Sequence, residues 1–189
     1  AAREAKADGK CADGRVHVNL DRASFRNADA AGEANGHYRG KGAEPGTIDL
    51  SAKLTRAGGG AVWRYLPLAV GQEVREWLHG AIIGGSATAT LRLKGDLQRF
   101  PYADGSGVFE VKGPFKGASL RYAPDWPEFT DVSGELEFVG PRMVIRANSA
   151  RLWGVTLADV RAEIADLDAS ETLLAVAGEA RGPSADFLR

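Results

Sequence analysis

Apolar and polar residues alternate with a period of two along most of the chain. The clearest run is 131–138, where Val132, Leu136 and Phe138 alternate with Asp131, Ser133, Glu135 and Glu137. Similar or shorter runs occupy 16–21, 48–55, 87–94, 108–112, 118–122, 143–148, 160–164 and 173–180. Strands with one apolar and one polar face are typical of antiparallel sheets. The pattern therefore predicts a mostly β fold.

Turn signals separate these runs at intervals of roughly 8–12 residues, which is the spacing of consecutive hairpins. They include a glycine triplet at 58–60, the Asp-Gly-Ser-Gly cluster at 104–107, Gly113-Pro114 and Gly140-Pro141. We therefore predict an antiparallel, strongly twisted or curved sheet.

One segment, 70–83, has helical periodicity instead. Its apolar residues follow the spacing of an amphipathic helix, and Gly84-Gly85 is a stop signal; they are Val70, Val74, Trp77, Leu78, Ala81 and Ile82. Pro183-Ser184 predicts the start of a second helix. Residues 1–14 lack periodicity and are predicted to be a loose leader, and 28–46 is weakly patterned with a poorly paired strand around Tyr38. Residues 15–189 are predicted to be a single elongated β-rich segment.

A single helix of this length cannot cover the predicted sheet, because 12 helical residues extend only about 18 Å. The apolar face must meet a second sheet, close into a barrel, pack on a neighbouring repeat or bind an apolar ligand. Each apolar residue is on its own more often core than ligand-binding. If an apolar ligand covers this face, the candidate binding residues are those in the apolar phase of the strands: Leu91, Leu93, Phe109, Val111, Leu120, Leu136, Phe138, Ile145 and Val176.

Charge and cysteine content narrow the partners. Lys and Arg (24) nearly balance Asp and Glu (25) in the 189 residues. This balance disfavours nucleic acid as a partner and provides no polybasic membrane-binding segment. One cysteine, Cys11, excludes an intrachain disulfide framework. No run approaches the roughly 20 apolar residues that span a bilayer.

Candidate chemistry is sparse. His17, His37 and His79 are far apart, and none has a carboxylate or cysteine at metal-ligand spacing, so we expect no metal, no cofactor and no catalytic residue. The aromatic segment 122–129 is interpreted as a packed connection between strands. An alternative is a carbohydrate-binding or hydrolytic domain that uses Tyr122 and Trp126.

Several short motifs occur in an order that resembles the YhdP-type branch of the AsmA-like proteins. The similarity covers roughly residues 36–189 and includes Trp63-Arg-Tyr-Leu-Pro67, Trp77-Leu78, Leu93-Lys-Gly-Asp-Leu97, Phe100-Pro101, Gly107-Val-Phe109, Tyr122-Ala-Pro-Asp-Trp-Pro127 and Gly178-Glu-Ala-Arg-Gly-Pro183. The resemblance identifies the chain as an internal fragment of such a protein.

The resemblance implies a periplasmic location in a Gram-negative cell envelope, within a long protein whose inner-membrane anchor lies outside this chain. It also implies repeated β-grooves whose apolar interior transports phospholipid to the outer membrane and supports its permeability barrier. Adjacent β-groove repeats of the same protein would then be partners, and no catalytic motif is implied. The competing hypothesis is a structural or interaction β-sandwich, in which a second sheet closes the apolar face.

Overall fold

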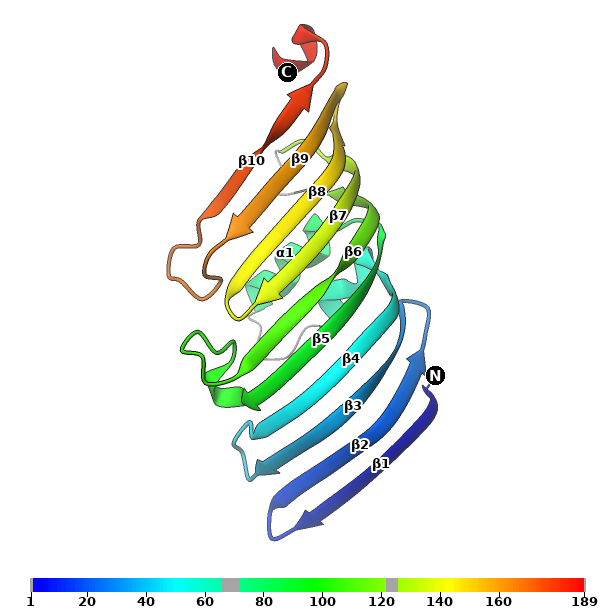
Figure 1. Ribbon diagram of the computed structural model, residues 1–189, viewed down its shortest axis with the longest axis vertical. Helices are drawn as coiled ribbons and strands as arrows, with labels where there is room; N and C mark the ends of the chain where they lie inside the picture. Colours follow the sequence, from blue (N-terminus) through cyan, green and yellow to red (C-terminus); the bar gives the residue numbers. More distant parts are fainter. Residues whose placement is uncertain (1, 66–71, 122–125, 189) are drawn as a thin grey trace.

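The computed structural model describes residues 2–65, 72–121 and 126–188, and these residues form a single antiparallel sheet of ten strands (Figure 1). Each strand pairs with its neighbours in sequence, so the spatial order is β1 to β10 without a crossover. The mostly β, antiparallel and curved prediction is confirmed. The strands are β1 (Ala2–Ala12), β2 (Arg15–Arg26), β3 (Ala30–Lys41), β4 (Thr47–Gly58), β5 (Ser86–Asp96), β6 (Val108–Leu120), β7 (Phe129–Val139), β8 (Arg142–Leu152), β9 (Val155–Ile164) and β10 (Leu174–Arg181).

The first strands correct two expectations from the sequence. Residues predicted as a loose leader form β1, which pairs with β2 from Ala2 to Ala12. The weakly patterned stretch forms β3, which pairs with strands on both sides rather than poorly. In both segments backbone hydrogen bonding to a neighbouring strand maintains the extended chain, and this pairing requires no alternation of side chains.

The predicted turn at Gly113-Pro114 is also wrong, because both residues lie inside β6. The runs 108–112 and 118–122 are therefore largely one strand. Gly113 faces Leu136, and Pro114 faces Glu135 with its side chain exposed. Gly117, with φ of +60°, lies at a register shift further along β6 and accommodates a bulge there.

The predicted helix is present as α1 (Gln72–Ala81), and residues 70 and 71 lie outside the described residues. A 3-10 helix, η1 (Gly59–Tyr65), precedes it, and two others are η2 (Leu97–Arg99) and η3 (Ser184–Leu188). The backbone N–H of Ile83 donates to Ser119 and that of Arg121 to Ala81, so the end of α1 is fastened to the end of β6. Figure 1 shows α1 behind the middle strands.

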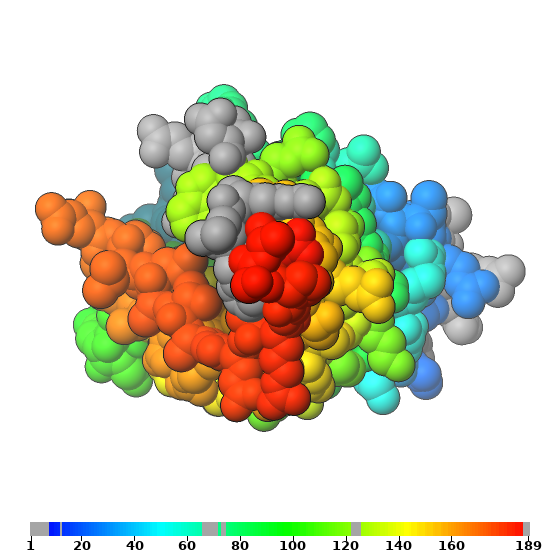
Figure 2. Space-filling model, turned by 90° about the horizontal axis from the view of Figure 1, so that it is seen from above, coloured from blue at the N-terminus to red at the C-terminus, as the bar shows by residue number. Residues whose placement is uncertain are grey.

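The sheet forms an elongated molecule without a second layer of strands in the described residues. Its strands succeed one another along the long axis, with β1 near one end and β10 near the other (Figure 1). Viewed along this axis, the N-terminal strands are displaced to one side of the C-terminal strands (Figure 2), as expected for a twisted sheet. The ten residues of α1 make a helix about 15 Å long, which covers only a small part of the length of the sheet.

Candidate functional site: an apolar track on the concave face

The strand register places one apolar residue from each of β2 to β10 in a single row. Every member is the direct cross-strand partner of the next, and direct partners project from the same face of a sheet. Eight intervals of about 4.8 Å give the row a length of about 38 Å. We call this row the apolar track: Ala23, Ala34, Ala52, Leu91, Val111, Phe138, Met143, Ile164 and Leu174.

The track is neither a closed core nor fully solvated. All nine of its members are half-buried, from Ala23 in β2 to Leu174 in β10. Closed cores bury most large apolar side chains completely. On this face of the described strands, no second sheet covers the row. The apolar face is therefore open.

Flanking rows widen this surface and contain most of the other predicted residues. On one side, Leu93 pairs with both Leu50 and Phe109. On the other side lies the row Leu136, Ile145, Ala162 and Val176. Of the nine residues predicted from the sequence, Leu91, Val111 and Phe138 lie on the track itself, and Leu93, Phe109, Leu136, Ile145 and Val176 lie in these rows.

The remaining predicted residue, Leu120, lies at the end of β6. It pairs with Phe129 and forms a bridge with Ile82, next to α1. The candidates also differ in exposure, since Leu93 is 9% exposed and Val176 is 62% exposed. Leu93 belongs to the small buried core, whereas Val176 is available to a partner or ligand.

Sequence reasoning missed six of the nine residues of the track. Met143, Ile164 and Leu174 carry the same alternation as the residues that were predicted, so the periodic signal was present for them. Ala52 belongs to the alternating run 48–55, but the small members Ala23 and Ala34 gave no such signal, because alanine is common on either face of a strand. Only the register reveals that they continue the row.

Two glycines show that the sheet bends towards this apolar face. Gly113 pairs with Leu136, and Gly134 lies two residues before Leu136 on the same strand face. A Cβ at Gly113 would clash with the carbonyl oxygen of Thr88 in β5 and lie 2.7 Å from the Cα of Ala89. A Cβ at Gly134 would meet the backbone of β8 in the same way. The backbones of the adjacent strands thus lie close to the apolar side of Gly113 and Gly134, as expected if the sheet curls towards that side. The apolar face is therefore the concave one.

Comparisons with known proteins show the family of this chain. The family model described as YhdP protein matches residues 2–189.

The chain belongs to the YhdP family.

This assignment confirms the resemblance inferred from the motifs. The intermembrane phospholipid transporter YhdP of Escherichia coli (strain K12) is 33% identical over 138 residues, which is 72% of this chain. The chain matches only 11% of the length of that relative. No solved structure matches the chain.

In this YhdP-family chain, the convex face opposite the track is charged and largely paired. Glu137 bridges Lys112 and Arg146, and Glu163 bridges Arg142 and Arg161 at 2.6 and 2.7 Å. These pairs surround Val144, which is 1% exposed although it belongs to this face. The aliphatic stems of long charged side chains therefore exclude water from an otherwise polar surface.

The ion pairs also affect ionisation. The hydrogen bond from Arg146, together with the charge of Lys112, lowers the pKa of Glu137, and hydrogen bonds from Arg161 and Arg142 lower the pKa of Glu163. Both carboxylates thus remain charged at neutral pH. At neutral pH the convex face of the sheet is therefore charged, whereas its concave face is apolar.

An aromatic cluster borders the concave face where β5 connects to β6. Phe100, in this connection, lies 4.8 Å from the ring of Phe109, which in turn lies 6.3 Å from Phe138. Tyr102 is 4% exposed, and its ring makes an edge-to-face contact with the ring of Phe100, with the two ring centroids 6.2 Å apart. The connection thus folds onto the apolar surface of the YhdP-family sheet at this rim.

The residues considered for other chemistry are not assembled into a site. Among the described residues, no group of His, Cys, Asp and Glu could hold a metal ion. The ring of His79 contacts Trp63 at 4.5 Å, and Cys11 is exposed. Trp126 is 56% exposed, in contrast to the packed connection interpreted from the sequence, and Tyr122 lies outside the described residues.

No helix in the described parts of the chain has the length and apolar character needed to cross a membrane.

Proposed function

We propose that the concave face of this chain is a groove for the acyl chains of phospholipid. The observation that carries the proposal is the apolar track, an unbroken row of half-buried apolar residues from β2 to β10. The name of the E. coli relative, an intermembrane phospholipid transporter, supports phospholipid as the ligand.

The groove would act passively, without catalysis or a cofactor. Moving an acyl chain from water onto an apolar surface gains about 0.8 kcal/mol per buried CH₂ group. Since direct partners along the track are all apolar, a chain that moves from strand to strand meets no charged side chain in the row. Transport along the track would therefore cost little at each step.

Adjacent β-groove repeats of a longer protein would extend this groove at both ends. Among the described strands, β1 pairs only with β2, and β10 pairs only with β9. Each outer strand thus offers an edge to which a further strand can add. Near the β10 end, Leu173 is 81% exposed and Val176 is 62% exposed, as expected of apolar residues that a neighbouring segment covers.

In the cell, the chain would be a periplasmic portion of an inner-membrane-anchored protein, with the anchor elsewhere in that protein. It would contribute to phospholipid transport between the inner and outer membranes, and thereby to the permeability barrier of the outer membrane. The name of the E. coli relative supports the intermembrane role.

The alternatives have less support. A β-sandwich spacer requires a second sheet over the apolar face, whereas the described strands make one sheet. A carbohydrate site would need aromatic rings beside a cleft. Trp126 is exposed, and Tyr122, the second ring of that alternative, lies outside the described residues.

The test is the variant Leu136→Asp, which places a carboxylate on the open apolar face. In an open groove the new carboxylate meets water when no lipid is present, so the free energy of unfolding should fall by only about 1–3 kcal/mol. Binding of a fluorescent acyl probe should be lost, because the probe must desolvate the charge. Chemical denaturation and probe titration measure the two effects.

Val139→Asp is the matched control, since Val139 lies on the convex face of the same strand, between Glu110 and Arg142, and is 45% exposed. It adds the same charge and should leave probe binding unchanged. Equal loss of probe binding in both variants would refute the groove. Unfolding of Leu136→Asp at ambient temperature would indicate a closed core at this position.

A further inference from the structure

One rim of the sheet brings four cations together. In the register of β1 to β3, Arg15 faces Lys41, and Lys10 and Arg39 lie on either side of His17. Cross-strand partners have Cβ atoms about 4.5–5.5 Å apart, and like charges at this spacing are destabilising. We call Lys10, Arg15, Arg39 and Lys41 the rim cations. Their arrangement is unfavourable unless an anion compensates it.

Elsewhere on the convex face, arginines are compensated within the chain. Arg22 lies 2.9 Å from Glu33, and Arg142 lies 2.6 Å from Glu163. By contrast, all four rim cations are exposed, and none of them forms an ion pair with a carboxylate of the described residues. The rim therefore has uncompensated positive charge in a chain whose net charge is -1.

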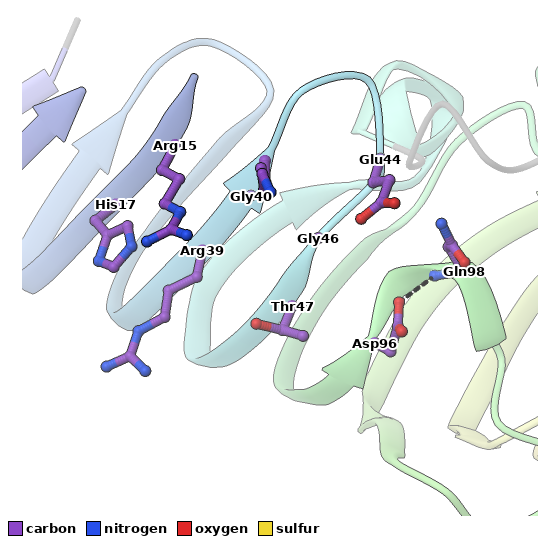
Figure 3. Close-up of a pocket in the computed structure, with 10 residues that line it drawn as sticks. Arg15, His17, Arg39, Gly40, Glu44, Gly46, Thr47, Asp96 and Gln98 are labelled. Atoms are coloured by element: carbon purple, nitrogen blue, oxygen red, sulfur yellow. Dashed lines mark hydrogen bonds between the residues drawn. The ribbon is translucent and has the colours of Figure 1, made fainter. Parts of the chain in front are cut away.

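Three of the rim cations, Arg15, Arg39 and Lys41, line a hollow of about 380 Å³ (Figure 3). Backbone hydrogen bonds hold the wall of this hollow in place. The N–H of Gly42 donates to Gly14 at 2.9 Å, and that of Leu97 donates to Gly46 at 2.9 Å, so three connections are tied together. A hollow of fixed shape requires little reorganisation to receive a ligand. Its lining residues are Arg15, His17, Arg39, Gly40, Lys41, Glu44, Gly46, Thr47, Asp96 and Gln98.

The two acids of the hollow do not neutralise the rim cations. Asp96 accepts a hydrogen bond from the backbone N–H of Gln98 at 2.9 Å and faces Thr47 in the register. Glu44 lies in the β3–β4 connection, where its backbone N–H donates to Lys41. Neither carboxylate pairs with a cation of the described residues. An anion would therefore bind nearest to Arg15, Arg39 and Lys41.

Apolar surface continues to this same rim on the concave side. Val16 pairs with Gly40 and is 40% exposed, and Val18 pairs with Tyr38 and is 36% exposed. Tyr38 reaches over the rim, where its hydroxyl donates to the carbonyl of Pro45 at 3.0 Å. A ligand with acyl chains on Val16 and Val18 would have its polar end at the strand ends, within reach of flexible Arg and Lys side chains.

We propose that the rim cations bind the phosphate group of a phospholipid whose acyl chains lie on the concave face. The proposal rests on the groove proposed above and adds the headgroup chemistry to it. Guanidinium groups make paired, charge-assisted hydrogen bonds to phosphate oxygens, and the ammonium group of lysine supplies further donors. The rim then favours lipids with net negative headgroups.

Isothermal titration calorimetry with short-chain lipids tests the proposal. The chain should bind dihexanoyl phosphatidylglycerol at least about tenfold more tightly than dihexanoylglycerol, which has the same acyl chains and no phosphate. In the double variant Arg15→Gln/Arg39→Gln this ratio should fall towards one, while binding of dihexanoylglycerol stays unchanged. Unchanged neutral-lipid binding also shows that the variant is folded.

The control is Arg22→Gln/Arg181→Gln, which removes the same charge from arginines paired with Glu33 and Glu179. It should keep the wild-type ratio, and an equal loss would overturn the proposal in favour of a general charge effect. Equal wild-type binding of both lipids would overturn the headgroup site and leave the groove intact. No binding of either lipid would overturn both.

Glycerol 3-phosphate distinguishes a lipid headgroup from free phosphate. It should bind the wild-type chain at least about tenfold more weakly than dihexanoyl phosphatidylglycerol, because it lacks acyl chains. Equal affinity of the two would assign the hollow to soluble phosphates and overturn the lipid assignment.

Discussion

Tyr102 is the buried polar side chain that lacks a hydrogen-bond partner among the described residues. Its ring is 4% exposed and fills the space beside Gly95 and Gly107, where a Cβ would come within 2.8 and 2.6 Å of the ring. Burial, followed by the charge of Asp96, raises the pKa of its hydroxyl. The ring contributes packing, whereas the hydroxyl contributes a desolvation cost.

We therefore expect Tyr102→Phe to keep or raise the free energy of unfolding, by up to about 1–3 kcal/mol. Tyr102→Ala should lower it by about 3–5 kcal/mol, since it removes the packed ring. Urea denaturation followed by circular dichroism measures both. A loss of more than about 1 kcal/mol in Tyr102→Phe would mean that the hydroxyl has a stabilising partner.

At the scale of elements, the alternation predicted most strands and their faces because burial of one face acts on every second residue. It did not predict β1 or β3, where backbone pairing rather than apolar alternation supports the strand. Gly113-Pro114 was misread as a turn because the same residues that break strands also permit close approach of a neighbouring strand. Such contacts between strands are invisible to a local pattern.

Two glycine-to-alanine variants compare a glycine that a neighbouring strand approaches closely with a glycine that has free space around it. Gly113→Ala should lower the free energy of unfolding by about 1–3 kcal/mol, because the new methyl group meets the backbone of β5. Gly80→Ala, in α1, has nothing within 4 Å of the new Cβ and should raise it by about 0.5–1 kcal/mol. Thermal and urea denaturation provide the comparison. A stabilised Gly113→Ala would contradict a sheet curled towards its apolar face at this point.

For the whole molecule, the sequence predicted an apolar face too large for its one helix, and the structure shows that face open and concave. Openness could not be predicted, because alternation determines which side chains share a face but not what covers that face. The continuity of the track was hidden for a related reason. It depends on the register between strands, which places Ala34 and Ala52 in line with Leu91 and Val111.

The central claim is that acyl chains lie on the concave face and not on the convex one. Site-specific photo-crosslinking tests it with the photoreactive residue p-benzoylphenylalanine at Ala52 or Lys53, which are adjacent in β4 and project from opposite faces. The purified chain is irradiated with vesicles of radiolabelled phosphatidylethanolamine and phosphatidylglycerol. We predict lipid adducts at position 52 and none at position 53. Adducts at both positions, or only at position 53, would contradict the groove.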